Sequence, residues 1–245
     1  DAAARADINE EQKARVRSLA IKLYHLWGED SLDRLDSKGA AEKFEKVLQI
    51  DPEHKDAMAR ILILWERDPA MNARLVAIYQ KRFEQNPDDI ESARKLADLL
   101  IRDKNTAAAI PYLIMIRQAS ATPDVINEER LFDALSQRYS EAARENNFAA
   151  AITAFEEFLK YFPDEDPAPL FFYQYSEKIK NLADDDLDGR VEIALFCKTV
   201  KLDDEAKKEI LYVLEKNPKH EQAIKLLADY AQSDISEAEL AFSRK

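Results

Sequence analysis

Apolar residues recur at three- and four-residue spacing along most of the chain, a pattern typical of helices that bury one face. The clearest example lies between Tyr79 and Ile116 and contains two apolar stripes separated by a polar break at residues 103–106. The stripes consist of Ile90, Ala93, Leu96, Ala97 and Leu100, then Ala109, Ile110, Leu113, Met115 and Ile116. They predict two paired helices, a hairpin unit of about 34 residues that the rest of the chain repeats.

A polar residue followed by proline recurs along the chain, at Asp51-Pro52, Asp68-Pro69, Asn86-Pro87, Thr122-Pro123 and Asn217-Pro218. We expect each polar residue to cap a helix whose first position is the proline. The intervals between Pro52, Pro87, Pro123 and Pro163 are 35, 36 and 40 residues, and the interval from Pro163 to Pro218 is 55. Near-regular spacing predicts an array of hairpins with an insertion near residues 164–189.

At the start of the chain, Asn9 and Gln12 have the spacing of a capping box that opens a helix. Its expected apolar face is Val16, Leu19, Ala20, Leu23, Tyr24 and Trp27. Gly28 is expected to end this helix, and residues 29–38 to form a loop before a second helix. That second helix carries an apolar face of Ala40, Phe44, Val47 and Leu48.

Two further signals concern helix ends. Pro111 lies inside a predicted helix and should kink it or mark a later start. Residues 236–239 read Ser-Glu-Ala-Glu, which predicts a capping box that opens a short final helix reaching about Phe242.

These patterns resemble the tetratricopeptide repeat (TPR), whose signature places small residues where paired helices touch and a proline at the end. The matching positions include Trp27-Gly28, Ala40, Phe44, Val47 and Pro52; Leu96, Ala97, Ala109, Leu113 and Ile116; Ala151, Phe155, Phe158 and Pro163; Ala206, Ile210, Val213 and Pro218; and Leu227, Ala228 and Ala231. The resemblance implies an all-α, right-handed helical-hairpin solenoid of about eleven to thirteen helices. Residues 1–245 would form a single domain of about five repeats, with a capping helix at the C-terminus.

In this family, the first helix of each hairpin lines a concave groove that holds a peptide or a partner helix. The resemblance therefore assigns a groove to His25, Ala59, Ile63, Glu66, Arg94, Asp98, Ile101, Ser136 and Ser140. Only Arg94 matches the basic residues with which some members bind acidic chaperone tails. A mixed, acidic-leaning groove favours a partner with apolar anchors and basic residues. The alternative is that these side chains are simply solvated.

Composition narrows the range of functions. A net charge of −12 argues against a nucleic-acid backbone or an anionic membrane as the main partner. Three glycines among 245 residues argue against phosphate loops and Rossmann turns, and no apolar run is long enough to span a bilayer. The first residue is Asp1 rather than Met, which fits either signal-peptide removal or an artificial boundary. We expect a soluble bacterial protein, with cytoplasm and periplasm equally open.

One acidic segment resembles the first half of an EF-hand calcium loop. Asp184, Asp186 and Asp188 alternate before Gly189, so three carboxylates could bind calcium weakly. The twelfth position, which should supply a bidentate Glu, is Leu195. The alternative is an acidic loop between helices, with Asp188 placed near a helix start, where negative charge is favourable.

The remaining chemistry indicates binding rather than catalysis. Four aromatic residues among positions 171–175 could anchor a partner or pack in the core. The histidines are scattered, Cys197 is expected to be buried, and no catalytic or cofactor motif occurs. The sequence predicts a non-catalytic scaffold without a cofactor that binds a protein or peptide within a larger assembly. The alternative is a structural helical-repeat protein that self-associates, with possible calcium modulation.

Overall fold

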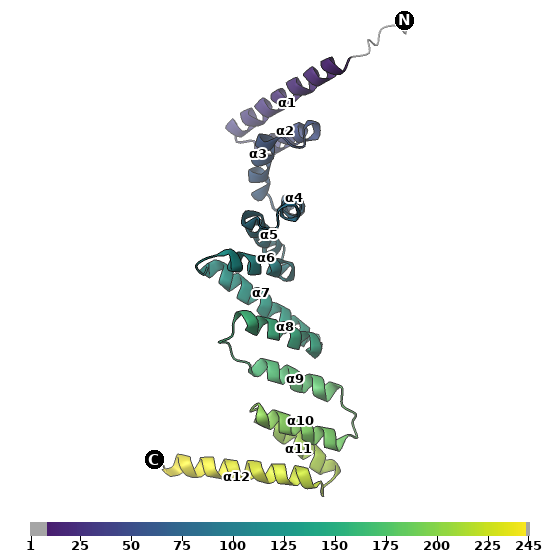
Figure 1. The fold of residues 1–245 in the computed structure, drawn as a ribbon, viewed down its shortest axis with the longest axis vertical. Coiled ribbons are helices and arrows are strands. Elements are labelled where there is room, and N and C mark those ends of the chain that lie inside the picture. Colours follow the sequence, from purple (N-terminus) through teal and green to yellow (C-terminus); the bar gives the residue numbers. More distant parts are fainter. Residues whose placement is uncertain (1–8, 244–245) are drawn as a thin grey trace. The chain divides into compact units, whose positions relative to one another are not determined.

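The computed structural model describes the backbone of residues 9–243, and the side chains of residues 9–232 (Figure 1). Within this described part, the chain forms twelve α-helices, one short 3-10 helix and no strand. The predicted all-α fold is therefore confirmed. The chain divides into two compact units between Ala119 and Ser120.

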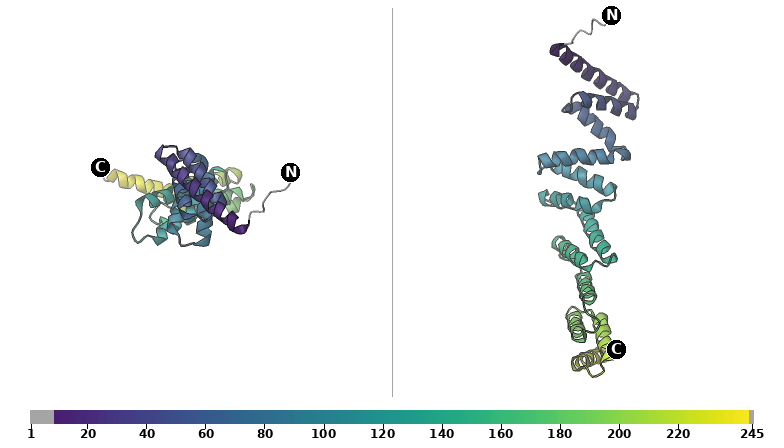
Figure 2. Two further views of the ribbon diagram at one scale, coloured as in Figure 1. Left: turned by 90° about the horizontal axis from the view of Figure 1, so that it is seen from above. Right: turned by 90° about the vertical axis from the view of Figure 1, so that its right-hand side faces the viewer.

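The first unit contains six α-helices and the 3-10 helix η1: α1 (Glu10–Asp33), α2 (Ser37–Ile50), α3 (Lys55–Glu66), η1 (Pro69–Met71), α4 (Asn72–Gln85), α5 (Ile90–Arg102) and α6 (Thr106–Ala119). The second unit contains α7 (Val125–Arg144), α8 (Phe148–Tyr161), α9 (Ala168–Lys180), α10 (Leu187–Thr199), α11 (Asp203–Lys216) and α12 (Glu221–Ser243). Inside each unit, a helix mainly contacts the helices before and after it in the sequence, as both views show (Figures 1 and 2). This is the packing of a helical repeat. A single domain over residues 1–245 stays a prediction.

The same type of tight turn joins the two helices in each of four pairs: α1 with α2, α5 with α6, α7 with α8 and α10 with α11. In each turn a residue with positive φ follows the first helix: Leu35 (61°), Lys104 (59°), Asn146 (56°) and Lys201 (62°). The next amide reaches back five residues, as in the bond of 2.9 Å from Asn147 N to Ala142 O. This arrangement is the Schellman motif. It identifies these four pairs as hairpins, whereas η1 separates α3 from α4, and residues 181–186 separate α9 from α10.

Close approach within a hairpin depends on a small residue facing a large one. In α1, Gly28 is buried, and a Cβ atom on it would lie 2.7 Å from Phe44 Cζ of α2. Phe44 itself is fully buried with Ala40 and Val47, the other predicted core residues of α2. The missing side chain of Gly28 thus makes room for the Phe44 ring, and the contact brings the two helices together.

The structure confirms the start of α1 and corrects its end. Asn9 and Gln12 form the predicted capping box, with Gln12 N 2.8 Å from Asn9 Oδ1. The helix does not stop at Gly28, so the predicted loop at residues 29–38 is wrong: the helix continues to Asp33, and α2 begins at Ser37. The glycine has a packing role instead of a helix-ending one.

The predicted apolar face of α1 is wrong for four of its six residues, whereas Ala20 and Tyr24 are partly buried. Val16, Leu19, Leu23 and Trp27 are 45–60% exposed. The helix packs through a side that shares only its edge with the predicted face: Gly28 is buried, and Ile21 and Tyr24 are partly buried against the core of the first unit.

The polar-proline pairs mark turns rather than helix starts. Asn86 ends α4, and α5 begins at Ile90 with Asp89 as its N-cap, so the prediction for Asn86-Pro87 is wrong. The turn closes through a hydrogen bond of 3.0 Å from Asp89 N to Asn86 O. The turns at Asp51 and Asn217 close in the same way. Only Asp68-Pro69 behaves as predicted, as the cap and first residue of η1.

Two expected helix boundaries are absent. The helix α6 begins at Thr106, so Pro111 lies inside it and does not mark a later start. The helix α12 is continuous from Glu221 to Ser243, so no separate helix begins at Ser236. The side chains of that predicted capping box lie outside the described residues. The insertion expected near residues 164–189 contains a helix of its own, α9.

We predict that Phe44→Ala destabilises the first unit by about 3–5 kcal/mol, because the change empties a fully buried ring position. Both tryptophans, Trp27 and Trp65, lie in this unit, so urea unfolding followed by tryptophan fluorescence reports on it. Leu19→Ala, at a side chain 58% exposed, is the matched control and should cost less than about 1 kcal/mol. Equal losses from the two changes would contradict the hairpin core.

Candidate functional site

Seven of the nine predicted groove residues lie in the first unit, on α1, α3 and α5: His25, Ala59, Ile63, Glu66, Arg94, Asp98 and Ile101. Ala59, Ile63, Arg94 and Asp98 are exposed. His25 is half-buried, with its ring 5.4 Å from that of Phe44. These positions thus combine exposed apolar and charged side chains on α3 and α5, and their role as a groove stays a prediction.

Glu66 has a structural role. Its carboxylate lies 2.9 Å from Lys95 Nζ of α5 and accepts a hydrogen bond of 3.0 Å from the Tyr79 hydroxyl of α4. Arg102 donates to the main-chain oxygen of Glu66 at 3.2 Å. Partial burial opposes ionisation, but the hydrogen bonds from Lys95 and Tyr79 prevail and lower the pKa of Glu66. The charged carboxylate therefore links α3, α4 and α5.

The other two predicted groove residues, Ser136 and Ser140, lie on α7 in the second unit. Both are half-buried, and the Ser136 hydroxyl oxygen is buried without a hydrogen-bond partner. This hydroxyl faces the protein interior rather than solvent. The structure therefore places Ser136 in helix packing.

The acidic segment before α10 is organised by helix capping and by one contact with a histidine ring. Asp186 caps α10 by accepting a hydrogen bond of 2.8 Å from Gly189 N. Asp188 lies 3.1 Å from His220 Nε2, and Asp184 is exposed. Among the described residues, no group of three His, Cys, Asp or Glu side chains could hold a metal ion. Calcium binding by Asp184, Asp186 and Asp188 stays a prediction.

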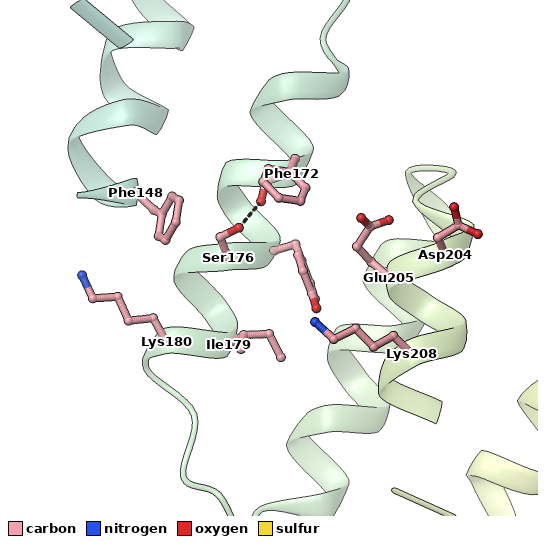
Figure 3. A pocket seen from close by; sticks show the side chains of 9 residues that line it. Phe148, Phe172, Ser176, Ile179, Lys180, Asp204, Glu205 and Lys208 are labelled. Carbon is pink, nitrogen blue, oxygen red and sulfur yellow. Dashed lines mark hydrogen bonds between the residues drawn. The ribbon is translucent and has the colours of Figure 1, made fainter. Parts of the chain in front are cut away.

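A groove that the sequence did not reveal lies on the second unit, over α9. It has a volume of about 470 Å³ and is lined by side chains from α8, α9 and α11 (Figure 3). Its lining is Phe148, Phe172, Tyr175, Ser176, Ile179, Lys180, Asp204, Glu205 and Lys208. Three of these residues, Ile179, Asp204 and Lys208, also line a second hollow of about 650 Å³ along α11. The result is an apolar floor between charged edges.

The aromatic segment at residues 171–175 supplies part of this groove. Tyr173 packs toward the core, with its ring 6.1 Å from that of Phe155, and Tyr175 is buried. Phe172 points outward and is 42% exposed. The core-packing interpretation thus holds for the two tyrosines, whereas a role of the exposed Phe172 as a partner anchor stays a prediction.

A buried polar network holds α9 against the next two helices. Glu209 of α11 is 2% exposed, and it accepts a hydrogen bond of 2.7 Å from the Tyr175 hydroxyl of α9. Its other oxygen lies 2.6 Å from Arg190 of α10. The Arg190 guanidinium lies 3.8 Å from the ring centroid of Tyr212. Burial and the neighbouring Glu209 raise the pKa of Tyr175, which keeps its hydroxyl protonated as a donor.

Cys197, His25 and His54 all take part in helix packing or capping. Cys197 is fully buried, as predicted, and burial raises the pKa of its thiol to about 12. The rings of His25 and His54 lie 5.5 Å apart, and His54 caps α3 by accepting from Ala57 N at 3.2 Å. No described helix has the length and apolar character needed to cross a membrane.

No protein-family model and no curated protein matches the chain. Several solved structures are similar. A MamA protein has 18% identical residues over 82% of this chain and 93% of its own, with a TM-score of 0.33. YrrB, described as a TPR protein with an unusual peptide-binding site, has 12% identical residues over 90% of this chain and 99% of its own, with a TM-score of 0.36. The TPR domain of P58(IPK) has 14% identical residues over 92% of this chain and 68% of its own, with a TM-score of 0.35. With these low values, the fold assignment rests on the hairpins of this chain.

We predict that Glu209→Gln destabilises the second unit by roughly 3 kcal/mol or more, because it leaves the Arg190 charge buried without its carboxylate partner. Urea unfolding followed by far-ultraviolet circular dichroism measures the change. The matched control is Glu157→Gln, which breaks the half-exposed pair between Arg138 and Glu157 and should cost less than about 1 kcal/mol. A Glu209 variant as stable as the control would show that the buried network does not hold α9.

Proposed function

We propose that this chain is a non-catalytic scaffold that binds a peptide or a partner helix within a larger assembly. The observation that carries this proposal is the groove over α9. Its floor includes Phe148, Phe172 and Ile179, and its edges carry both lysines and carboxylates. An open groove of this composition suits a protein segment with apolar anchors and charges on both sides. The buried thiol of Cys197 and the capping role of His54 favour binding over catalysis.

The first unit offers a second surface for the same function. Ala59 and Ile63 on α3 and Arg94 and Asp98 on α5 are exposed on consecutive odd-numbered helices. The hydrogen bonds that Glu66 receives from α4 and α5 hold these helices in place. An apolar and mixed-charge surface of this kind fits a partner with apolar anchors and some basic residues, which supports the groove predicted for this unit.

Self-association is the second candidate, and the exposed stripe on α1 favours it. Val16, Leu19, Leu23 and Leu26 follow a three-four-three spacing, and each is at least 45% exposed. A contiguous exposed apolar stripe of this kind suggests a covering partner. An antiparallel second copy would bring Lys13, Arg15 and Arg17 toward the acidic end of the partner's α1, which carries Glu29, Asp30 and Asp33.

We predict that a photo-crosslinking residue in place of Lys208, at the edge of the groove, captures a partner protein in native extract. The same residue in place of Lys160, which is exposed on α8 outside the groove, is the matched control and should capture none. Mass spectrometry identifies the captured protein and the crosslinked peptide. We expect capture at position 208 because this position lies beside the apolar floor and the charged edges of the groove, where a bound partner would make its contacts.

Equal capture at both positions, or no capture at either, would contradict binding in the groove. Light scattering on the purified chain separates the two candidates. A mass of 28.1 kDa supports partner binding, whereas a stable species of twice that mass, disrupted by Leu19→Asp on α1, supports self-association.

A further inference from the structure

The exposed face of α9 repeats the pattern of a helix that pairs with a hairpin partner. The first helix of a TPR hairpin carries large, large, small and large residues at positions i, i+3, i+4 and i+7. Two helices of the second unit have this pattern with serine as the small residue. On α7 the residues are Phe132, Leu135, Ser136 and Tyr139, and on α9 they are Phe172, Tyr175, Ser176 and Ile179.

On α7, the second helix of the hairpin covers this face. The Phe132 ring lies 5.1 Å from the Phe158 ring of α8, and the Tyr139 ring lies 4.7 Å from that of Phe155. Ser136 is small enough to allow this approach, and its hydroxyl oxygen is buried. The covered face on α7 thus shows what this pattern does when its hairpin is complete.

On α9, the same face is covered only in part. Tyr175 is buried and Ile179 partly buried against the core of α10 and α11, and the Tyr175 hydroxyl donates to Glu209 of α11. Phe172 is 42% exposed, and together with Ser176 and Ile179 it lines the groove. The Ser176 hydroxyl donates to the Phe172 main-chain oxygen at 2.9 Å, within its own helix (Figure 3). Its hydrogen bond is therefore made inside α9, and the side chain adds only a small surface at the centre of the face.

Among the described helices, none forms a tight-turn hairpin with α9. No tight turn with a positive-φ residue follows α9, and α10 packs much more closely against α11 than against α9. The next helix, α10, forms its hairpin with α11 instead. The groove between α8 and α11 therefore lies on the α9 face that a second helix covers in the complete hairpin of α7.

We propose that an amphipathic helix of a partner protein binds in this groove, antiparallel to α9, and completes the missing hairpin. This inference rests on the proposed function and specifies its partner. Recognition of an amphipathic helix in an apolar groove is a common mode of peptide binding. The partner helix presents aromatic or aliphatic residues to Phe172 and Ile179, as Phe158 and Phe155 of α8 do to Phe132 and Tyr139 of α7, and it passes close to Ser176.

The charges at the groove edges indicate the direction and polarity of the bound helix. Lys180 and Lys208 lie near Ile179, toward the end of α9, whereas Asp204 and Glu205 lie nearer Phe172 (Figure 3). An antiparallel helix starts beside the two lysines and ends beside the two carboxylates. Acidic residues in its first turn and basic residues in its last turn therefore complement the groove, and both placements also favour the helix dipole.

The test uses the whole chain and a synthetic peptide. The peptide places an alanine and two phenylalanines at the spacing of Ala151, Phe155 and Phe158 of α8, with glutamates in its first turn and lysines in its last. A second peptide has these charges exchanged. By fluorescence anisotropy, we expect the acidic-first peptide to bind about tenfold or more tightly than the basic-first peptide. We also expect it to gain helical circular dichroism on binding.

Two variants locate the site. Ser176→Phe fills the groove and should weaken binding by about tenfold or more, whereas Thr153→Phe should not. Thr153 is the matched control because it is exposed on α8 and also bonds back to its own helix, at 3.1 Å. The surface change Lys208→Glu should remove the preference for the acidic-first peptide. Equal binding of the two peptides, or an unchanged affinity with Ser176→Phe, would overturn the inference.

These outcomes are distinguishable from failure of the proposed function. If crosslinking at position 208 captures a partner but neither peptide binds, the scaffold function stands and the helical occupant is wrong. If neither experiment detects binding, the groove is not a binding site and both proposals fail.

Discussion

The fold depends on close contact between two helices, which needs a small residue on one and a large side chain on the other. Gly28 and Phe44 show the constraint most directly, since even one added carbon at Gly28 would collide with the Phe44 ring. The same arrangement recurs where Ala97 of α5 is buried in the hairpin with α6. Each hairpin buries apolar side chains locally, so each unit can be built from contacts between neighbouring helices.

Two helices, α3 and α9, depart from this arrangement, and a hollow or groove lies beside each of them. On α3, Leu62 takes the position of the small residue, α4 packs only loosely against α3, and a hollow of about 440 Å³ lies beside Trp65. On α9, the small residue Ser176 is present but the second helix is missing, and the groove results. In the first case, η1 separates the two helices. In the second, the sequence between α8 and α10 contains one helix where a hairpin needs two.

Periodicity predicted the helices and the buried faces of α2 and α5, because apolar spacing depends only on local geometry. It failed on α1, where Val16, Leu19 and Leu23 form a regular stripe that no described helix covers. An apolar stripe in the sequence shows that one face of a helix is apolar, but it does not show which element, if any, packs against that face. The groove was missed for the same reason: the aromatic residues at 171–175 were recognised, but their partners Glu209 and Lys208 are more than thirty residues away. Whether an apolar side chain lies in the core or on the surface depends on which helices pack together, and local sequence does not specify this.

Hydrogen–deuterium exchange of α7 and α9, measured with and without the acidic-first peptide, tests the central claim that α9 lacks a hairpin partner. Helix amides exchange through local opening, so a helix packed on fewer neighbours exchanges faster. In the free chain, α9 should exchange faster than α7, and the peptide should slow α9 selectively. Protection of α9 equal to that of α7 without peptide, or slowing spread equally over both helices, would contradict the claim.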